Sequence, residues 1–146
     1  MDNTGTKEWG VAILRVVVGI VFLAHGSQKV FVYGFAGVQG AFTQMGIPLP
    51  TIMGPFIAVL ELAGGIALIV GLVTRWVAIL FAIEMAFAVL KVHLSGGFFL
   101  PRGYEFALTM SAASLALAMA GPGAASLDNM LFAKREVGRS MHAGGA

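Results

Sequence analysis

Long apolar blocks separated by short polar stretches dominate this chain. A helix needs roughly 20 residues to cross about 30 Å of hydrocarbon. Four blocks reach or approach that length, at about 10–33, 52–73, 76–93 and 104–121. Only Thr74, Arg75 and Trp76 separate the second block from the third, so these two helices should be antiparallel neighbours. The pattern predicts an all-α integral membrane protein, a single domain over residues 1–146 built as an up-down-up-down four-helix bundle.

Two further segments have helical periodicity but are too short to span a membrane. Apolar residues repeat at helical spacing between Phe35 and Met45, which predicts a short interfacial helix after the first span. The fourth block ends at Gly121-Pro122-Gly123, a strong helix terminator. Within the tail, residues 122–146, Ser126 can then cap a short amphipathic helix from Leu127 through Arg135.

Composition places the chain among membrane proteins and excludes several chemistries. Hydrophobic residues make up 58% of the sequence and charged residues 11%, about half the charged share of a soluble domain. The net charge of +2 comes from scattered basic residues, so no nucleic-acid partner is expected. The absence of cysteine excludes disulfides, thiolate nucleophiles and cysteine-ligated iron–sulfur clusters. The polar start of the chain lacks the basic region of a cleavable signal peptide, so the first span is expected to remain.

The distribution of basic residues predicts an orientation. With four spans, both termini and the turn at Arg75 share one side of the membrane. That side carries Lys7, Arg75, Lys134, Arg135 and Arg139, against Lys29, Lys91 and Arg102 toward the other. The positive-inside rule therefore predicts that both termini are cytoplasmic.

Polar residues interrupt the first block along one helical face. At 100° per residue this face carries Arg15, Gly19, Phe22, Gly26 and Lys29, with His25 at its edge. Because a charge in hydrocarbon is costly, the face should point toward protein or a water-filled cavity. Arg15 lies near the start of the block, at its cytoplasmic end, and we expect its guanidinium to extend to the membrane surface on that side.

Carboxylates in the other blocks supply candidate partners for these cations. Glu61 shares a face with glycines, the kind of surface along which membrane helices approach. Glu84 lies nine residues past Arg75, about 14 Å along the helix and so near the middle of the membrane. We expect Glu61 to pair with Lys29 or with His25. The whole candidate polar pocket comprises His25, Lys29, Glu61, Glu84, Lys91, Tyr104 and Glu105.

These residues also have plainer interpretations. Buried ion pairs often only fix helix register. Lys91 and Arg102 are expected to extend toward water, and His93 to lie at the interface. Carboxylate-bridged di-metal sites in helical bundles use Glu-x-x-His pairs, and neither His25 nor His93 has a glutamate three residues before it, so no metal site is predicted.

Four segments together resemble the signature blocks of the DoxX family. They are GIVFLAHGSQKVF (19–31), FTQMGIPLP (42–50), ELAGGIALIVGLVTRWVAI (61–79) and GPGAASLD (121–128). The resemblance implies a small four-helix protein of the bacterial inner membrane. It implies relatives that include a subunit of a thiosulfate:quinone oxidoreductase and a mycobacterial member that assembles with superoxide dismutase and a sulfurtransferase. His25, Lys29 and Glu61 match the polar positions that recur in the family.

Three functional hypotheses follow. The first is a membrane subunit or anchor of a redox or stress-response complex that binds a quinone in the polar pocket. In it Lys29 or His25 donates a hydrogen bond to the quinone, Glu61 orients the donor or supplies a proton, and a partner protein supplies the electrons. The second is a non-enzymatic scaffold that recruits soluble partners. The third is a small proton-coupled transporter, suggested by the depth of Glu84. Every predicted helix has a face of small residues, more than one bundle core needs, so we also consider a homo-oligomer.

Overall fold

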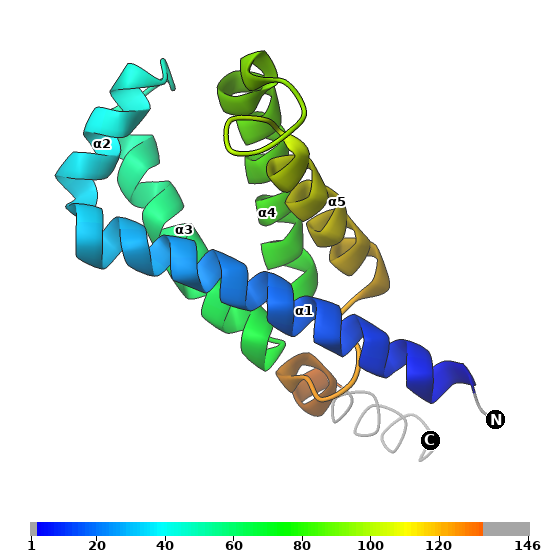
Figure 1. Cartoon of the computed structure of the whole chain (residues 1–146). Helices are drawn as coiled ribbons and strands as arrows, with labels where there is room; N and C mark the ends of the chain where they lie inside the picture. Colours follow the sequence, from blue (N-terminus) through cyan, green and yellow to red (C-terminus); the bar gives the residue numbers. More distant parts are fainter. Residues whose placement is uncertain (1–2, 133–146) are drawn as a thin grey trace, which may run out of the picture.

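A computed structural model describes residues 3–132, and this part of the chain is helical without a strand (Figure 1). The main helices are α1 (Asn3–Ser27), α2 (Gly34–Gln44), α3 (Pro50–Val70), α4 (Thr74–Ala88) and α5 (Glu105–Ala120). Shorter segments are the π-helices η1 (Gln28–Tyr33) and η2 (Val89–His93) and the 3₁₀-helix η3 (Leu94–Gly96). The predicted all-α class is therefore confirmed.

Three helical stretches in the described residues are long and apolar enough to cross a membrane. They are Thr4–Gln44, Pro50–Val70 and Thr74–Gly96. The predicted fourth block forms α5, whose 16 residues extend for about 24 Å, less than the hydrocarbon thickness. The protein is therefore a helical membrane protein, and the prediction of four full spans is supported for three of them.

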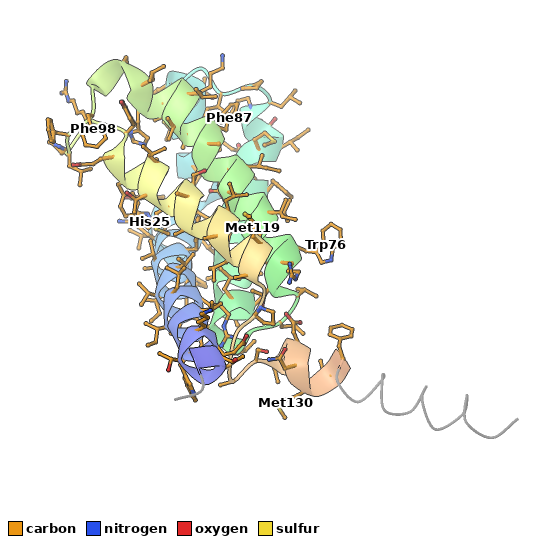
Figure 2. All side chains as sticks on the ribbon, turned by 90° about the vertical axis from the view of Figure 1, so that its right-hand side faces the viewer. His25, Trp76, Phe87, Phe98, Met119 and Met130 are labelled. Atoms are coloured by element: carbon orange, nitrogen blue, oxygen red, sulfur yellow. The ribbon has the colours of Figure 1, made fainter. Side chains whose placement is uncertain are left out.

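The helices form two pairs that meet at one end of the molecule and diverge at the other. α1 packs against α3, and α4 packs against the antiparallel α5 (Figure 1). We call the end with the start of α1, the α3–α4 turn and residues 121–132 the closed end. The opposite end, with α2, the start of α3, η2 and η3, is the open end. In Figure 2, Trp76 and Met130 lie toward the closed end and Phe98 at the open end. Although α3 and α4 are consecutive and antiparallel, they separate toward the open end.

Glycines bring α1 and α3 into backbone contact. A methyl group on Gly65 would lie 2.5 Å from the Leu23 amide nitrogen, and one on Gly19 would lie 2.9 Å from the Gly65 carbonyl oxygen. The predicted face of α1 therefore does point into protein. Next to it, the rings of Phe22 and Phe81 stack with centroids 3.6 Å apart and join the two helix pairs in one apolar core.

The α3–α4 turn lies three residues earlier than predicted. α3 ends at Val70, and Gly71 follows with a φ of 70°, a left-handed conformation that favours glycine. Thr74, predicted as part of the turn, is instead the first residue of α4. The reason is that the Asp128 carboxylate accepts the N–H groups of Val73 and Thr74, at 2.7 and 2.9 Å, and so caps the helix.

The helix predicted between the first two spans exists as α2. Its Val38 and Phe42 are buried in a small second core with Ile47. This core also contacts Val92 of η2, so α2 packs on the open end of both helix pairs. Its placement at the membrane interface stays a prediction.

Arg15 corrects one prediction, because it does not extend to the membrane surface. Its side chain is buried, with 2% exposure, and donates hydrogen bonds to the carbonyl oxygens of Pro122, Ala124 and Ala125. Backbone carbonyls of the chain itself thus accept hydrogen bonds from both terminal nitrogens of the guanidinium.

Residues 121–128 complete the closed end and begin the predicted tail helix. The Ser126 hydroxyl accepts the Asn129 N–H at 3.2 Å, which confirms the predicted cap, and residues 127–132 are helical. The rest of the helix predicted to Arg135, and the remainder of the tail, lie outside the described residues.

Candidate binding cavity

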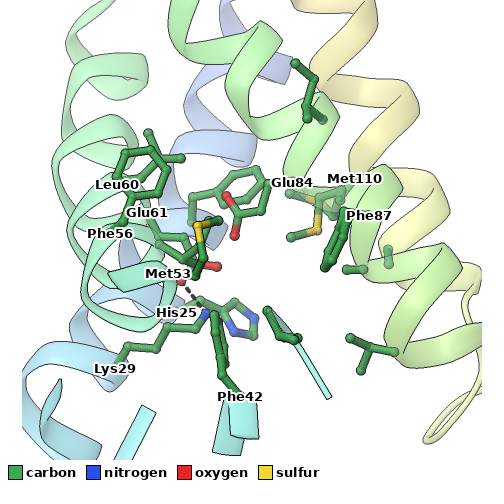
Figure 3. Close-up of a pocket in the computed structure, with 18 of the residues that line it drawn as sticks. His25, Lys29, Phe42, Met53, Phe56, Leu60, Glu61, Glu84, Phe87 and Met110 are labelled. Carbon is green, nitrogen blue, oxygen red and sulfur yellow. Dashed lines mark hydrogen bonds and ion pairs between the residues drawn. The ribbon is translucent and has the colours of Figure 1, made fainter. Parts of the chain in front are cut away.

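A cavity of about 500 Å³ lies where the two helix pairs diverge, and all five main helices contribute to its walls (Figure 3). Most of the wall is apolar, and aromatic and methionine side chains supply much of it. They include Phe42 from α2 and Met45 just after it, Met53 and Phe56 from α3, Phe87 from α4, and Phe106 and Met110 from α5. The volume falls in the range of small-molecule sites, which are concave and mostly apolar with a few polar groups.

An ion pair between Lys29 and Glu61 provides part of the polar wall. The Lys29 ammonium donates a hydrogen bond to Oε2 of Glu61. The Glu61 side chain is 3% exposed and that of Lys29 is 21% exposed. Of the two predicted pairings for Glu61, the one with Lys29 is therefore confirmed.

Local backbone structure explains how these two groups meet. Gly26 lies directly against Glu61 and Leu62 of α3, in a space that no side chain would fit. Immediately after this contact the α-helix changes to the π-helix η1, which contains Lys29. π-Helical turns are rare and occur frequently at functional sites, where they redirect side chains.

Glu84 faces this pair from the opposite wall. Figure 3 shows its carboxyl group pointing from α4 toward Glu61. Its Oε2 atom is buried and has no hydrogen-bond partner among the described residues. A buried polar atom without a partner is uncommon and costs free energy, so Glu84 offers an open hydrogen-bonding position inside the cavity.

His25 lies on the same wall as Lys29, nearer the surface. Its side chain is exposed, it lines the cavity, and its ring lies 6.0 Å from that of Phe106. The cavity therefore brings together His25, Lys29, Glu61 and Glu84, four of the seven residues of the predicted polar pocket.

The other three, Lys91, Tyr104 and Glu105, do not line the cavity. Lys91 is exposed, because the π-helix η2 changes the helical phase between Glu84 and this position. Tyr104 instead ends the loop before α5, and Glu105 is the first residue of that helix. The Tyr104 ring packs edge-on against that of Phe98, and a Glu105 oxygen accepts the Leu100 N–H at 2.7 Å.

The inward face of α5 also differs from the prediction. Placing Glu105 in the candidate pocket implied that the small and polar face of α5 which it shares with Thr109 points inward. The buried residues are instead Ala107, Met110, Ser114 and Leu117. Both faces carry small residues, so composition alone did not distinguish them.

Sequence reasoning also missed the apolar walls. Phe106 and Met110 line the cavity, but they lie in a sequence where apolar residues are common, and nothing marks them out. His93, predicted to be interfacial, lines one end of the cavity. Among the described residues, no three histidine, aspartate or glutamate side chains are grouped as a metal site.

Comparison with known proteins identifies the family. The DoxX family model matches residues 10–94. A protein named putative oxidoreductase CatD from Bacillus subtilis is 35% identical over 132 residues, covering 90% of this chain and 93% of the relative. An uncharacterized protein from Haemophilus influenzae is 38% identical, covering 88% and 95%, and the inner membrane protein YqjF from Escherichia coli is 34% identical, covering 88% and 96%. No solved structure matches the chain. The chain belongs to the DoxX family.

Proposed function

We propose that this DoxX-family membrane protein binds a quinone in the cavity and acts as the quinone-binding subunit of a redox complex. The observation that carries the proposal is that the Lys29–Glu61 pair and the Glu84 carboxyl group face each other from two walls of an otherwise apolar cavity. A relative named as a putative oxidoreductase supports a redox role.

The cavity suits a quinone in both size and chemistry. A quinone has a flat ring with two carbonyl acceptors and an apolar tail, and about 500 Å³ with aromatic walls accommodates the ring and the start of the tail. The Lys29 ammonium has three N–H groups, of which Glu61 takes one, so it can also donate to a quinone carbonyl. The reduced quinol carries hydroxyl groups, and these can donate to Glu84.

Each polar residue then has a defined role in the reaction. Reducing a quinone to a quinol takes two electrons and two protons. We assign the electrons to a partner protein with a redox cofactor, since this chain has no cysteine that could form a dithiol. Glu84 passes the two protons to the quinone oxygens one after the other and is reprotonated from water after each, and Glu61 orients Lys29 toward the ring.

Binding of a short-chain ubiquinone analogue to the purified protein in detergent tests this function directly. Lys29→Met removes the donor to a quinone carbonyl and is tested with the oxidised analogue, whereas Glu84→Gln removes the carboxyl acceptor of a quinol hydroxyl and is tested with the reduced analogue. We expect each to weaken binding about tenfold or more, because a hydrogen bond to a charged group contributes about 1.5–3 kcal/mol. Isothermal titration calorimetry of wild type and variants gives the dissociation constants.

The chain offers matched controls outside the cavity. Lys91→Met and Glu105→Gln repeat the same chemical changes at residues that do not line it, and both should bind like wild type. Absence of saturable binding to wild type, or equal losses in the cavity and control variants, would contradict the proposal.

The two other hypotheses make different predictions in the same variants. For a scaffold, Lys29→Met and Glu84→Gln should leave the set of co-purifying proteins unchanged while no quinone binds. For a proton-coupled transporter, Glu84→Gln should abolish proton movement in liposomes that contain no quinone. No contact in the described residues favours either one over quinone binding.

A further inference from the structure

We propose that a second pocket, at the open end of the molecule, binds the phosphate of an anionic phospholipid headgroup. This pocket of about 350 Å³ is lined by Val92, His93, Ser95, Gly96, Pro101 and Arg102. It lies between the end of α4, continued by η2 and η3, and the loop that leads to α5. The proposal does not depend on the quinone site.

The loop that forms the outer wall of this pocket is held by its own backbone. The Tyr104 N–H donates to the Gly97 carbonyl and the Glu105 N–H to the Phe98 carbonyl, both at 3.0 Å. Gly103 packs so closely on Phe98 that a side chain at this position would meet backbone atoms. The neighbouring residue Arg102 is therefore attached to an ordered loop.

Two contacts fix Arg102 against the helix end. Its carbonyl oxygen lies 3.4 Å from Nδ1 of His93, and its backbone packs directly on Gly96, where a Cβ atom would not fit. Arg102, His93 and Ser95 consequently line one pocket.

The positive charge of Arg102, beside His93 and Ser95, suits an anion with several acceptor oxygens. No acidic residue lines the pocket. The carboxylate that follows the loop, Glu105, is already engaged by the Leu100 N–H. Arginine presents a planar set of donors that matches phosphate, and serine supplies one more donor.

The surroundings favour a lipid as the source of the phosphate. Phe98, Phe99 and Leu100, on the same loop, are 45%, 76% and 58% exposed. Aromatic and apolar side chains next to an arginine at the end of a membrane helix are typical of the interface between hydrocarbon and headgroups. In a bilayer this loop would hold the pocket at the depth of lipid phosphates, and Figure 2 shows Phe98 at that end of the molecule.

The pocket also adjoins the larger cavity, because Val92 and His93 line both. A phospholipid held by Arg102 would therefore have its headgroup beside one end of that cavity. The two sites remain separate in composition, since Arg102 and Ser95 do not line the larger one.

Native mass spectrometry of the protein in detergent tests the proposal, with phosphatidylglycerol and phosphatidylcholine added in equal amounts. We expect wild type to retain more phosphatidylglycerol than phosphatidylcholine. In Arg102→Gln the ratio of retained phosphatidylglycerol to phosphatidylcholine should fall about tenfold. Lys91→Gln, which removes an exposed cation at the same end, should behave like wild type. Arg102→Lys keeps the charge without the planar donors and should give an intermediate value, which separates recognition from misfolding.

Three results would overturn the proposal. One is equal retention of the two lipids by wild type, and another is unchanged retention in Arg102→Gln. The third is full displacement of phosphatidylglycerol by millimolar inorganic phosphate, which would make a soluble anion the ligand. Quinone binding by Arg102→Gln, measured separately, should equal that of wild type, so loss of one site is distinguishable from loss of the other.

Discussion

Single glycines determine how closely α1 and α3 approach, and Gly65 shows this most directly. Gly65→Ala would place a methyl group 2.5 Å from the Leu23 amide nitrogen, and backbone atoms cannot rotate away as a flexible side chain can. We expect the substitution to destabilise the protein by about 1–3 kcal/mol, the usual cost of overpacking. Thermal unfolding in detergent, followed by circular dichroism, measures the change.

Gly40→Ala is the matched control. Gly40 lies within α2, and a methyl group there would meet nothing within 4 Å. Alanine favours the helix over glycine by about 1 kcal/mol, so this variant should be as stable as wild type or more stable. Equal losses from both substitutions would mean that contact between α1 and α3 does not limit stability.

At the level of elements, Arg15 ties α1 to the segment that follows α5. Arg15→Met would leave the Pro122, Ala124 and Ala125 carbonyls without their donor, while keeping most of the side-chain volume. Because removing one partner strands buried polar groups, we expect a loss of about 2–5 kcal/mol in stability. Thermal unfolding again measures it, and Arg102→Met at an exposed position should change little. Similar unfolding temperatures for the two variants would contradict a structural role for Arg15.

The same element shows where prediction from sequence stops. The sequence correctly placed Arg15 on the protein-facing side of α1, because helical periodicity determines which residues share a face. It did not reveal the partner, because the acceptors are backbone carbonyls more than a hundred residues away, and every residue has such a carbonyl. The prediction that Arg15 extends to the membrane surface considered only its charged side chain and not the backbone carbonyls that could accept from it.

Helical phase limits the prediction of the cavity in a similar way. Glu61 and Glu84 lie in regular α-helix and Lys29 near the start of the π-helix η1, and the structure brings all three to one cavity as the sequence suggested. Lys91 does not join them, because it lies within the π-helix η2, and no residue pattern in that stretch signals the change. On this helix the candidate pocket was therefore correct at Glu84, before η2, and wrong at Lys91, within it.

For the molecule as a whole, the sequence predicted helices and their order but not their divergence. Apolar length determines which segments are helical in a membrane, whereas the angle between pairs depends on where side chains fill the space. Phe22 and Phe81 fill it toward the closed end. Gly26 and Gly65 hold α1 and α3 in backbone contact, and the space that opens between the two helix pairs toward the open end is the cavity.

The orientation in the membrane is the remaining prediction at this scale. Thr6, near the start of α1 at the closed end, and Thr51, at the start of α3 at the open end, are both exposed. Because the chain has no cysteine, Thr6→Cys and Thr51→Cys each introduce a single thiol with a small change in side-chain size. If the closed end is cytoplasmic, a membrane-impermeant maleimide should label Thr51→Cys in intact cells and Thr6→Cys only after permeabilisation.

The two threonine variants also test the architecture itself. The unsubstituted chain should remain unlabelled, which shows that the signal comes from the introduced thiol. The opposite labelling pattern would reverse the orientation but keep the two ends on different sides of the membrane. Labelling of both variants in intact cells would instead place both ends on one side of the membrane. We do not expect this result, because α3 is an apolar helix about 31 Å long that connects the two ends and is long enough to cross the hydrocarbon.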